Sequence, residues 1–199
     1  MLYSINMLLE VTAMIGGIIA GSIIGAIIIL IISVIVMYNN LVERSVRVDN
    51  AWSQIDVQMK QRYDLIPNLV ETVKAYAFHE KSTLEEVTRW RTAAMDAKNP
   101  EELMRSNQKL SGAIANIFAT AENYPDLKAN DNFLDLQRQL KDLEEKIAFA
   151  RQFYNDTVMK YNEYLQRFPS NFIANIFKYK ERPYFKMNET EKTVPKVQF

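Results

Sequence analysis

The side chains best suited to chemistry surround the only histidine of the chain. His79 is followed directly by Glu80, and two further carboxylates, Glu85 and Glu86, come soon after it. Histidine and carboxylates together can bind a divalent metal ion or transfer a proton. Such a site needs more ligands that converge on one point, and the sequence has no cysteine to supply them. A histidine close to a helix C-terminus is also favourable simply because its charge complements the helix dipole.

Other reactive groups lack partners in the sequence. Carboxylates such as Asp64 and Glu71 recur at helical spacing, which is typical of a solvated helix face. Four of the five glycines lie in one apolar segment, so Gly112 alone cannot form a glycine-rich phosphate loop. The 24 basic and 24 acidic residues give a formal net charge of zero, which disfavours nucleic-acid binding. We therefore expect no enzymatic activity, no metal, no cofactor and no nucleic-acid partner.

The first part of the chain has almost no charge. Glu10 is the only charged residue before Glu43, so residues 11–42 form an uncharged run. As a helix this run is roughly 48 Å long, and the hydrocarbon core of a bilayer is about 30 Å thick. We predict one transmembrane helix over residues 15–38, preceded by an extracytoplasmic or interfacial segment, residues 1–14. A cleaved signal peptide would have a basic start and a shorter apolar core.

Small residues recur every fourth position inside this segment. They form one smooth face of a helix and are Ala13, Gly17, Gly21 and Gly25. Such a face lets two helix backbones approach closely in lipid, so it predicts self-association through the membrane segment. The alternative is the ordinary tolerance of membrane helices for glycine.

An amphipathic helix continues from the membrane segment. From Val48 to Tyr76, apolar residues recur at alternating spacings of four and three, and Arg62 is the one exception. The pattern keeps its phase across Pro67, which therefore predicts a kinked helix and not a helix end.

Three further helices are predicted after this one. A capping-box pattern that begins at Ser82 indicates the first start. Asn99 as a cap and Pro100 in the first turn indicate the second. A polar loop over residues 126–132 then precedes the last long helix, which is predicted over residues 132–168.

The fold class is therefore all-α, with a single N-terminal transmembrane helix continuous with an elongated antiparallel up-and-down helical bundle over residues 39–168. The helix lengths allow either three long rods or four helices. Residues 169–186 are basic and aromatic, and residues 187–199 are expected to form a mobile tail. The candidate membrane-interface residues are Phe172, Phe177, Lys178, Lys180, Arg182 and Lys186. The alternative for this segment is a short helix that closes the end of the bundle.

Two tyrosine–asparagine pairs share one face of the last long helix. Tyr154-Asn155 and Tyr161-Asn162 are seven residues apart. They are expected in the bundle core with hydroxyls at its edge, and the alternative is control of helix register or a contact with a partner.

Several long motifs resemble those of the LemA family of bacterial membrane proteins. They are YNNLV at residues 38–42, NAWSQIDVQ at 50–58, RYDLIPNLV at 62–70, FHE at 78–80, both tyrosine–asparagine pairs, and FPSN at 168–171. The resemblance covers roughly residues 37–185. It implies a single N-terminal span, a cytoplasmic bundle of four helices and a location in the bacterial inner membrane. It implies little about biochemistry, because the family has no agreed enzymatic activity, and some relatives are associated with internal membrane organelles.

These observations favour a membrane-anchored, self-associating helical scaffold that organises membrane or partner proteins. Its partners would be membrane lipid, copies of itself and an unknown protein. One alternative is an adaptor or regulator of a membrane enzyme such as a peptidase, which would not form a large homo-oligomer. A less favoured alternative is an oligomeric pore, because a single uncharged span supports conduction only when many copies assemble.

The distribution of charge predicts the topology. No lysine or arginine precedes the span, whereas four basic residues follow it: Arg44, Arg47, Lys60 and Arg62. Positive flanks stay in the cytoplasm, so the N-terminus should lie outside and the large domain inside. A reporter enzyme fused after Phe199 should be active only if that enzyme works in the cytoplasm. Activity of a periplasm-dependent reporter at the same position would reverse the predicted orientation.

Overall fold

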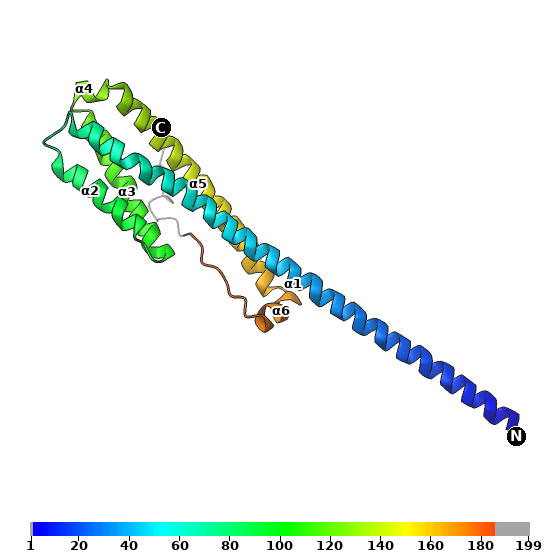
Figure 1. The fold of residues 1–199 in the computed structure, drawn as a ribbon. Coiled ribbons are helices and arrows are strands. Elements are labelled where there is room, and N and C mark those ends of the chain that lie inside the picture. The colour runs from blue at the N-terminus through cyan, green and yellow to red at the C-terminus, as the bar shows by residue number, and fades with distance from the viewer. Residues whose placement is uncertain (1, 186–199) are drawn as a thin grey trace, which may run out of the picture. The chain divides into compact units, whose positions relative to one another are not determined.

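The computed structural model describes the backbone of residues 2–185 and the side chains of residues 14–185. Within this range the secondary structure is entirely helical, which confirms the all-α prediction (Figure 1). The helices are α1 (Leu2–Lys74), α2 (Lys81–Met95), α3 (Pro100–Ala121), α4 (Pro125–Lys128), α5 (Asp131–Gln166) and α6 (Ser170–Ile176). The predicted tail over residues 187–199 lies outside the described residues.

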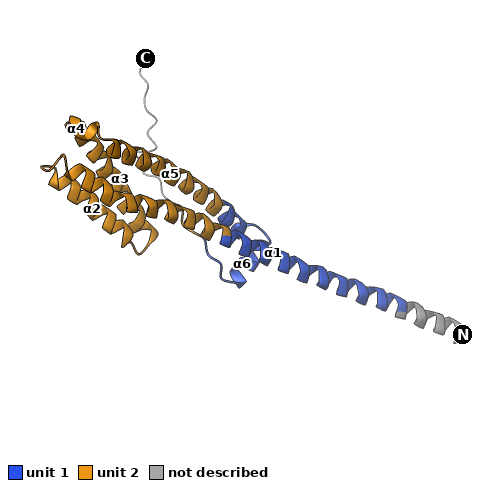
Figure 2. Ribbon diagram, turned by 45° about the horizontal axis from the view of Figure 1, so that its top comes forward, with its two compact units in different colours: residues 1–46, 160–181 blue, residues 47–159, 182–199 orange. Residues whose placement is uncertain are grey.

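The described chain divides into two compact units (Figure 2). The first unit contains residues 2–46 and 160–181, and the second contains residues 47–159 and 182–185. The long helices α1 and α5 each contribute residues to both units. The first unit therefore holds the apolar part of α1 together with α6, and the second holds α2, α3 and α4.

In the second unit, α1, α2, α3 and α5 lie alongside one another, and successive helices run in opposite directions (Figure 2). The chain reverses between α2 and α3, which pack side by side. A three-rod arrangement would have continued α2 into α3, so the structure has the four-helix alternative. The core consists of buried apolar side chains from each of these helices, among them Ile55, Met59, Ile66, Leu69, Val87, Leu110, Ile117, Ile147 and Val158.

The predicted start of α3 is confirmed in detail. The Asn99 side chain accepts a hydrogen bond from the Glu102 N–H at 2.9 Å, and Pro100 is the first helical residue. The Glu102 carboxylate in turn accepts from the Lys98 N–H at 3.1 Å. These contacts hold the pKa of Glu102 below its ordinary value, the hydrogen bond from Lys98 being the largest cause. Two otherwise unpaired backbone donors at the helix start are thereby satisfied.

Two local predictions are wrong. The capping box at Ser82 does not form, because α2 begins at Lys81 and the N-cap Glu80 makes no side-chain capping bond. The Leu84 N–H already bonds to the Glu80 carbonyl, so Ser82 is inside the first turn. The polar loop over residues 126–132 is also interrupted by α4, since Leu127 is fully buried and a short helical turn places it in the core.

The helix α1 passes through Pro67 without ending, as the unbroken apolar pattern predicted. It ends at Lys74, a few residues before the end expected from the pattern. Ile66 and Leu69, on either side of the proline, are both buried. Their burial gives the helix a reason to continue, because packing offsets the one backbone hydrogen bond that proline cannot make. The kink at Pro67 stays a prediction.

Candidate functional site

The apolar part of α1 is mostly exposed from Met14 to Val36. Within the described residues, this is the one helix long and apolar enough to cross a membrane, judged by length and composition. None of the residues in its most apolar stretch is buried inside the protein. Thirteen large apolar side chains between Met14 and Ile35 are exposed in this way. An exposed apolar surface of this extent is unfavourable in water and favourable in lipid.

The glycine face of this helix is open. A Cβ atom built on Gly17, Gly21 or Gly25 would meet nothing within 4 Å. No other part of the described chain therefore packs on the predicted self-association face. The side chain of Ala13, which was predicted to extend the row, lies outside the described residues.

The helix α6 is attached to α1 where the apolar run ends. The Tyr164 hydroxyl donates a hydrogen bond to the Met37 carbonyl at 3.3 Å. The rings of Tyr38 and Phe177 lie 4.5 Å apart, centroid to centroid. The guanidinium of Arg44 lies 4.7 Å above the Tyr164 ring. These contacts fix α6 and the end of α5 beside the last residues of the predicted transmembrane helix.

One face of α6 is apolar and exposed. Ile173 and Ala174 face the interior of the unit and are buried. Phe172 and Ile176 lie one turn apart on α6, Phe168 lies in the turn that precedes the helix, and all three are exposed, Phe168 by 80%. We call these three residues the α6 face. Lys178 and Lys180 follow it and are also exposed. Exposed aromatic and aliphatic side chains next to lysines are the composition of segments that lie in the membrane interface.

The segment after α6 is held in place by the tyrosine–asparagine pairs. In the first unit, the Tyr161 hydroxyl donates to the Lys180 carbonyl at 3.0 Å. In the second, the Tyr154 hydroxyl donates to the Pro183 carbonyl at 3.0 Å. Asn155 bonds twice to the backbone of Phe185: its amide nitrogen donates to the carbonyl at 2.9 Å, and its oxygen accepts from the N–H at 2.7 Å.

These bonds show that the two tyrosine–asparagine pairs hold the segment after α6. This role differs from both predicted roles, which were core packing and control of helix register or a partner contact. The tyrosine rings are buried, as expected for the core, but three of the polar groups hold the backbone of one extended segment. Arg182, predicted at the membrane interface, belongs to the second unit and pairs with Asp49 at 3.1 Å. Lys186, predicted with it, lies outside the described residues.

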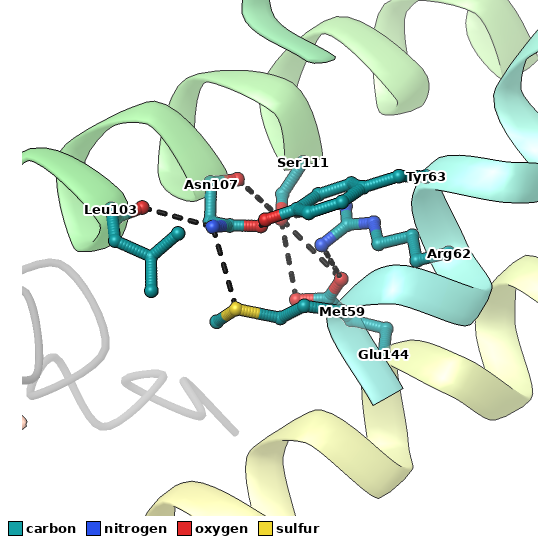
Figure 3. Close-up of polar contacts among 7 residues, drawn as sticks. All are labelled: Met59, Arg62, Tyr63, Leu103, Asn107, Ser111 and Glu144. Atoms are coloured by element: carbon teal, nitrogen blue, oxygen red, sulfur yellow. Dashed lines mark hydrogen bonds and ion pairs between the residues drawn. The ribbon is translucent and has the colours of Figure 1, made fainter. Parts of the chain in front are cut away.

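A buried polar network occupies the centre of the second unit (Figure 3). The Arg62 side chain projects from α1 into the core and is only 2% exposed. Its guanidinium donates to the Ser111 hydroxyl on α3 at 2.9 Å and pairs with the Glu144 carboxylate on α5 at 2.8 Å. Burial lowers the pKa of Arg62, and the charge of Glu144 opposes that shift. An arginine stays protonated at any physiological pH, so the charge requires this counter-ion.

Tyr63 extends the network to α3 and α2. Its hydroxyl donates to the Asn107 side chain at 2.9 Å, and its carbonyl accepts from the Arg91 guanidinium on α2 at 2.8 Å. The Asn107 amide donates in turn to the Leu103 carbonyl at 2.9 Å. Burial raises the pKa of Tyr63, so its hydroxyl remains a donor. Two adjacent residues of α1 thus bond to the three other long helices of the unit.

Sequence reasoning missed this network although it contained a signal. Arg62 is the one charged residue in the apolar pattern of α1, and a charge on a buried face demands a partner. Its partners, Ser111 and Glu144, are 49 and 82 positions away in residue number and carry no signal of their own.

The residues around His79 do not converge on one point. His79 is exposed and its ring lies against Phe78. The Glu80 carboxylate instead accepts a hydrogen bond from the Tyr124 hydroxyl at 3.2 Å. In the part of the chain that the structure describes, no group of three histidine or acidic residues is placed to hold a metal ion.

Comparison with known proteins identifies the family. A model of the LemA family matches residues 51–199. The chain belongs to the LemA family. Among relatives, magnetosome protein MamQ 2 of Paramagnetospirillum magneticum is 25% identical over 179 residues, which cover 77% of this chain and 66% of MamQ 2. Protein LemA of Metamycoplasma hominis is 26% identical over 140 residues, which cover 68% of this chain and 63% of that protein.

The chain spans just under two thirds of the length of these relatives. MamQ of Magnetospirillum gryphiswaldense is similar to the same extent, with 24% identity over 77% of this chain and 66% of its own. The LemA-family membership and the exposed apolar helix together fit a membrane-associated protein.

In this LemA-family protein, removing the part-exposed carboxylate that pairs with the buried Arg62 guanidinium should destabilise the second unit. Glu144→Ala leaves the Arg62 charge in the core without a counter-ion, at an expected cost of about 3 kcal/mol in the free energy of unfolding. Arg62→Met combined with Glu144→Gln removes both charges and should recover most of that loss. Urea unfolding followed by helical circular dichroism measures each variant. Losses that simply add in the double variant would show that the two side chains are not coupled.

Proposed function

We propose that this protein is a membrane-anchored helical scaffold that self-associates and organises membrane or partner proteins, without enzymatic activity. The observation that carries the proposal is the contact between Phe177, at the end of α6, and Tyr38 of α1, beside the bond from Tyr164 of α5 to Met37. It brings a second exposed apolar surface, the α6 face, next to the end of a helix that has the properties of a membrane anchor.

Two membrane contacts in one unit support a fixed placement at the bilayer surface. A single helix can rotate and tilt in lipid, whereas interfacial aromatic and basic residues oppose such motion. The α6 face and the lysines behind it supply these residues on the side of the anchor predicted to be cytoplasmic. The interface alternative for residues 169–186 is therefore favoured over closure of the bundle end alone.

The similarity to proteins named as magnetosome proteins supports a role in membrane organisation. The buried polar groups of the second unit support a structural role as well. Arg62 and Tyr63 of α1 donate hydrogen bonds to Ser111 and Asn107 of α3. These bonds join the two helices.

Self-association should depend on the open glycine face. Gly21→Leu together with Gly25→Leu places bulky side chains where two backbones would otherwise meet, which removes many small contacts at once. We expect smaller particles in detergent and less crosslinking in membranes. Ile23→Leu is a matched control, because it changes an exposed apolar residue of the same helix without filling the glycine row.

An unchanged assembly in the glycine variant would remove this face from the mechanism. A monomeric unmodified protein in both assays would contradict the scaffold and favour the adaptor alternative.

The α6 face should enter the membrane interface. The chain has no cysteine, so Ile176→Cys provides a single labelling site for a nitroxide. In vesicles that contain anionic lipid, we expect this label to be shielded from a water-soluble paramagnetic nickel complex and accessible to oxygen. A label at Lys109→Cys, on the exposed side of α3, is the control. Equal access of the nickel complex to both labels would contradict the interfacial placement.

A further inference from the structure

A second apolar surface lies in the second unit, where α5 runs beside α1. Phe149 and Phe153 on α5 are 72% and 53% exposed, and Val57 on α1 is exposed next to them. These three side chains line one shallow groove, in which Gln54 and Gln58 supply the polar edge. Two exposed phenylalanines one helical turn apart are an unusual feature of a surface that faces water.

A charged residue flanks the two phenylalanines on each side. Lys146 precedes Phe149 by three residues, and Asp156 follows Phe153 by three. Spacings of three and four place all four side chains on one face of α5, and all four are exposed. Neither Lys146 nor Asp156 forms an ion pair among the described residues. We call these four residues the α5 patch.

The α5 patch is complementary to itself when its direction is reversed. In an antiparallel pair of identical helices related by a two-fold axis near Arg151, Lys146 lies opposite Asp156 of the other copy, and Phe149 lies opposite Phe153. Each patch thus offers two apolar contacts flanked by two pairs of opposite charge. A parallel pair would instead set lysine against lysine and aspartate against aspartate, which is unfavourable.

We infer that the α5 patch is a docking surface for a second copy of this chain, with the two α5 helices antiparallel. The inference rests on the proposed self-association and adds to it a second contact, outside the membrane segment. The charge pattern indicates which partner binds here. A second copy of the same patch places an opposite charge against both Lys146 and Asp156.

The small size of the α5 patch indicates a contact that is too weak to hold two copies together without anchoring in one membrane. A buried phenylalanine contributes on the order of 200 Å², so four of them at their present exposure bury on the order of 500 Å². Stable complexes in solution usually bury about 1,600 Å². Anchoring both copies in one lipid surface raises their effective concentration, which makes a contact of this size effective.

Zero-length crosslinking tests the inference on the full chain in lipid vesicles. A carbodiimide joins a lysine and a carboxylate only when they touch. Lys146 and Asp156 of one α5 helix are about 15 Å apart along its axis, so they cannot react with each other. We expect mass spectrometry of the crosslinked dimer to identify a Lys146–Asp156 peptide. Absence of this peptide, while the protein still forms oligomers in detergent, would overturn the inference and leave the proposed self-association intact.

Charge exchange provides the decisive control. K146E and D156K each replace two attractive pairs by two repulsive ones, and neither leaves a lysine opposite a carboxylate, so each variant alone should give no crosslink between positions 146 and 156. A mixture of the two variants restores opposite charges at both ends, so crosslinking between positions 146 and 156 of different variants should return. K141E makes the same change on another exposed face of α5 and should have no effect. Circular dichroism checks that each variant stays helical.

The remaining outcomes also decide the question. A mixture no better crosslinked than either single variant would overturn the antiparallel arrangement. Crosslinks from the α5 patch to a different protein in native membranes, with none between copies, would overturn the assignment of its occupant. Retained α5 crosslinks in the Gly21→Leu, Gly25→Leu variant would support the α5 patch. They would contradict only the proposal that self-association depends on the membrane segment.

Discussion

A buried arginine is the constraint that organises the second unit. Arg62 carries a charge into a core of aliphatic side chains, and a buried charge is tolerated only with a counter-ion and hydrogen bonds. Glu144 and Ser111 satisfy it, and each belongs to a different helix. Apolar side chains pack closely but without specific partners, whereas the ion pair at 2.8 Å joins one position of α1 to one position of α5. The network therefore selects one register for α1, α3 and α5.

The two parts of helix α1 have different surfaces. Its first part has exposed apolar side chains and an open glycine face, and its last part buries an apolar stripe against its own chain. The end of the apolar run is marked by contacts and not only by composition, because Tyr164 of α5 bonds to Met37 and Phe177, at the end of α6, packs on Tyr38. These features fit a membrane-anchored protein with a helical domain.

Polar side chains on α5 decide the course of the segment after α6. Tyr161, Tyr154 and Asn155 bond to backbone atoms of this segment, so its path does not depend on its own side chains alone. Extended backbone has no internal hydrogen bonds, and partners from a neighbouring helix replace them. In the sequence, these tyrosines and the asparagine follow the spacing of ordinary core positions. In the structure, they bind the segment after α6, which has no regular secondary structure.

The sequence by itself determined the all-α class, the apolar N-terminal helix, the cap at Asn99 and the LemA family, because each depends on local composition, spacing or motif. It left open three rods or four helices, since equal lengths permit both, and only the packing of α2 on α3 decided between them. It misplaced the start of α2 and the loop at α4, where burial of Leu84 and Leu127 outweighed local capping signals. The partners of Arg62 and of the tyrosine–asparagine pairs came only from the tertiary structure. A hydrogen bond between residues far apart in the chain leaves no periodic pattern, and only the folded backbone brings donor and acceptor together.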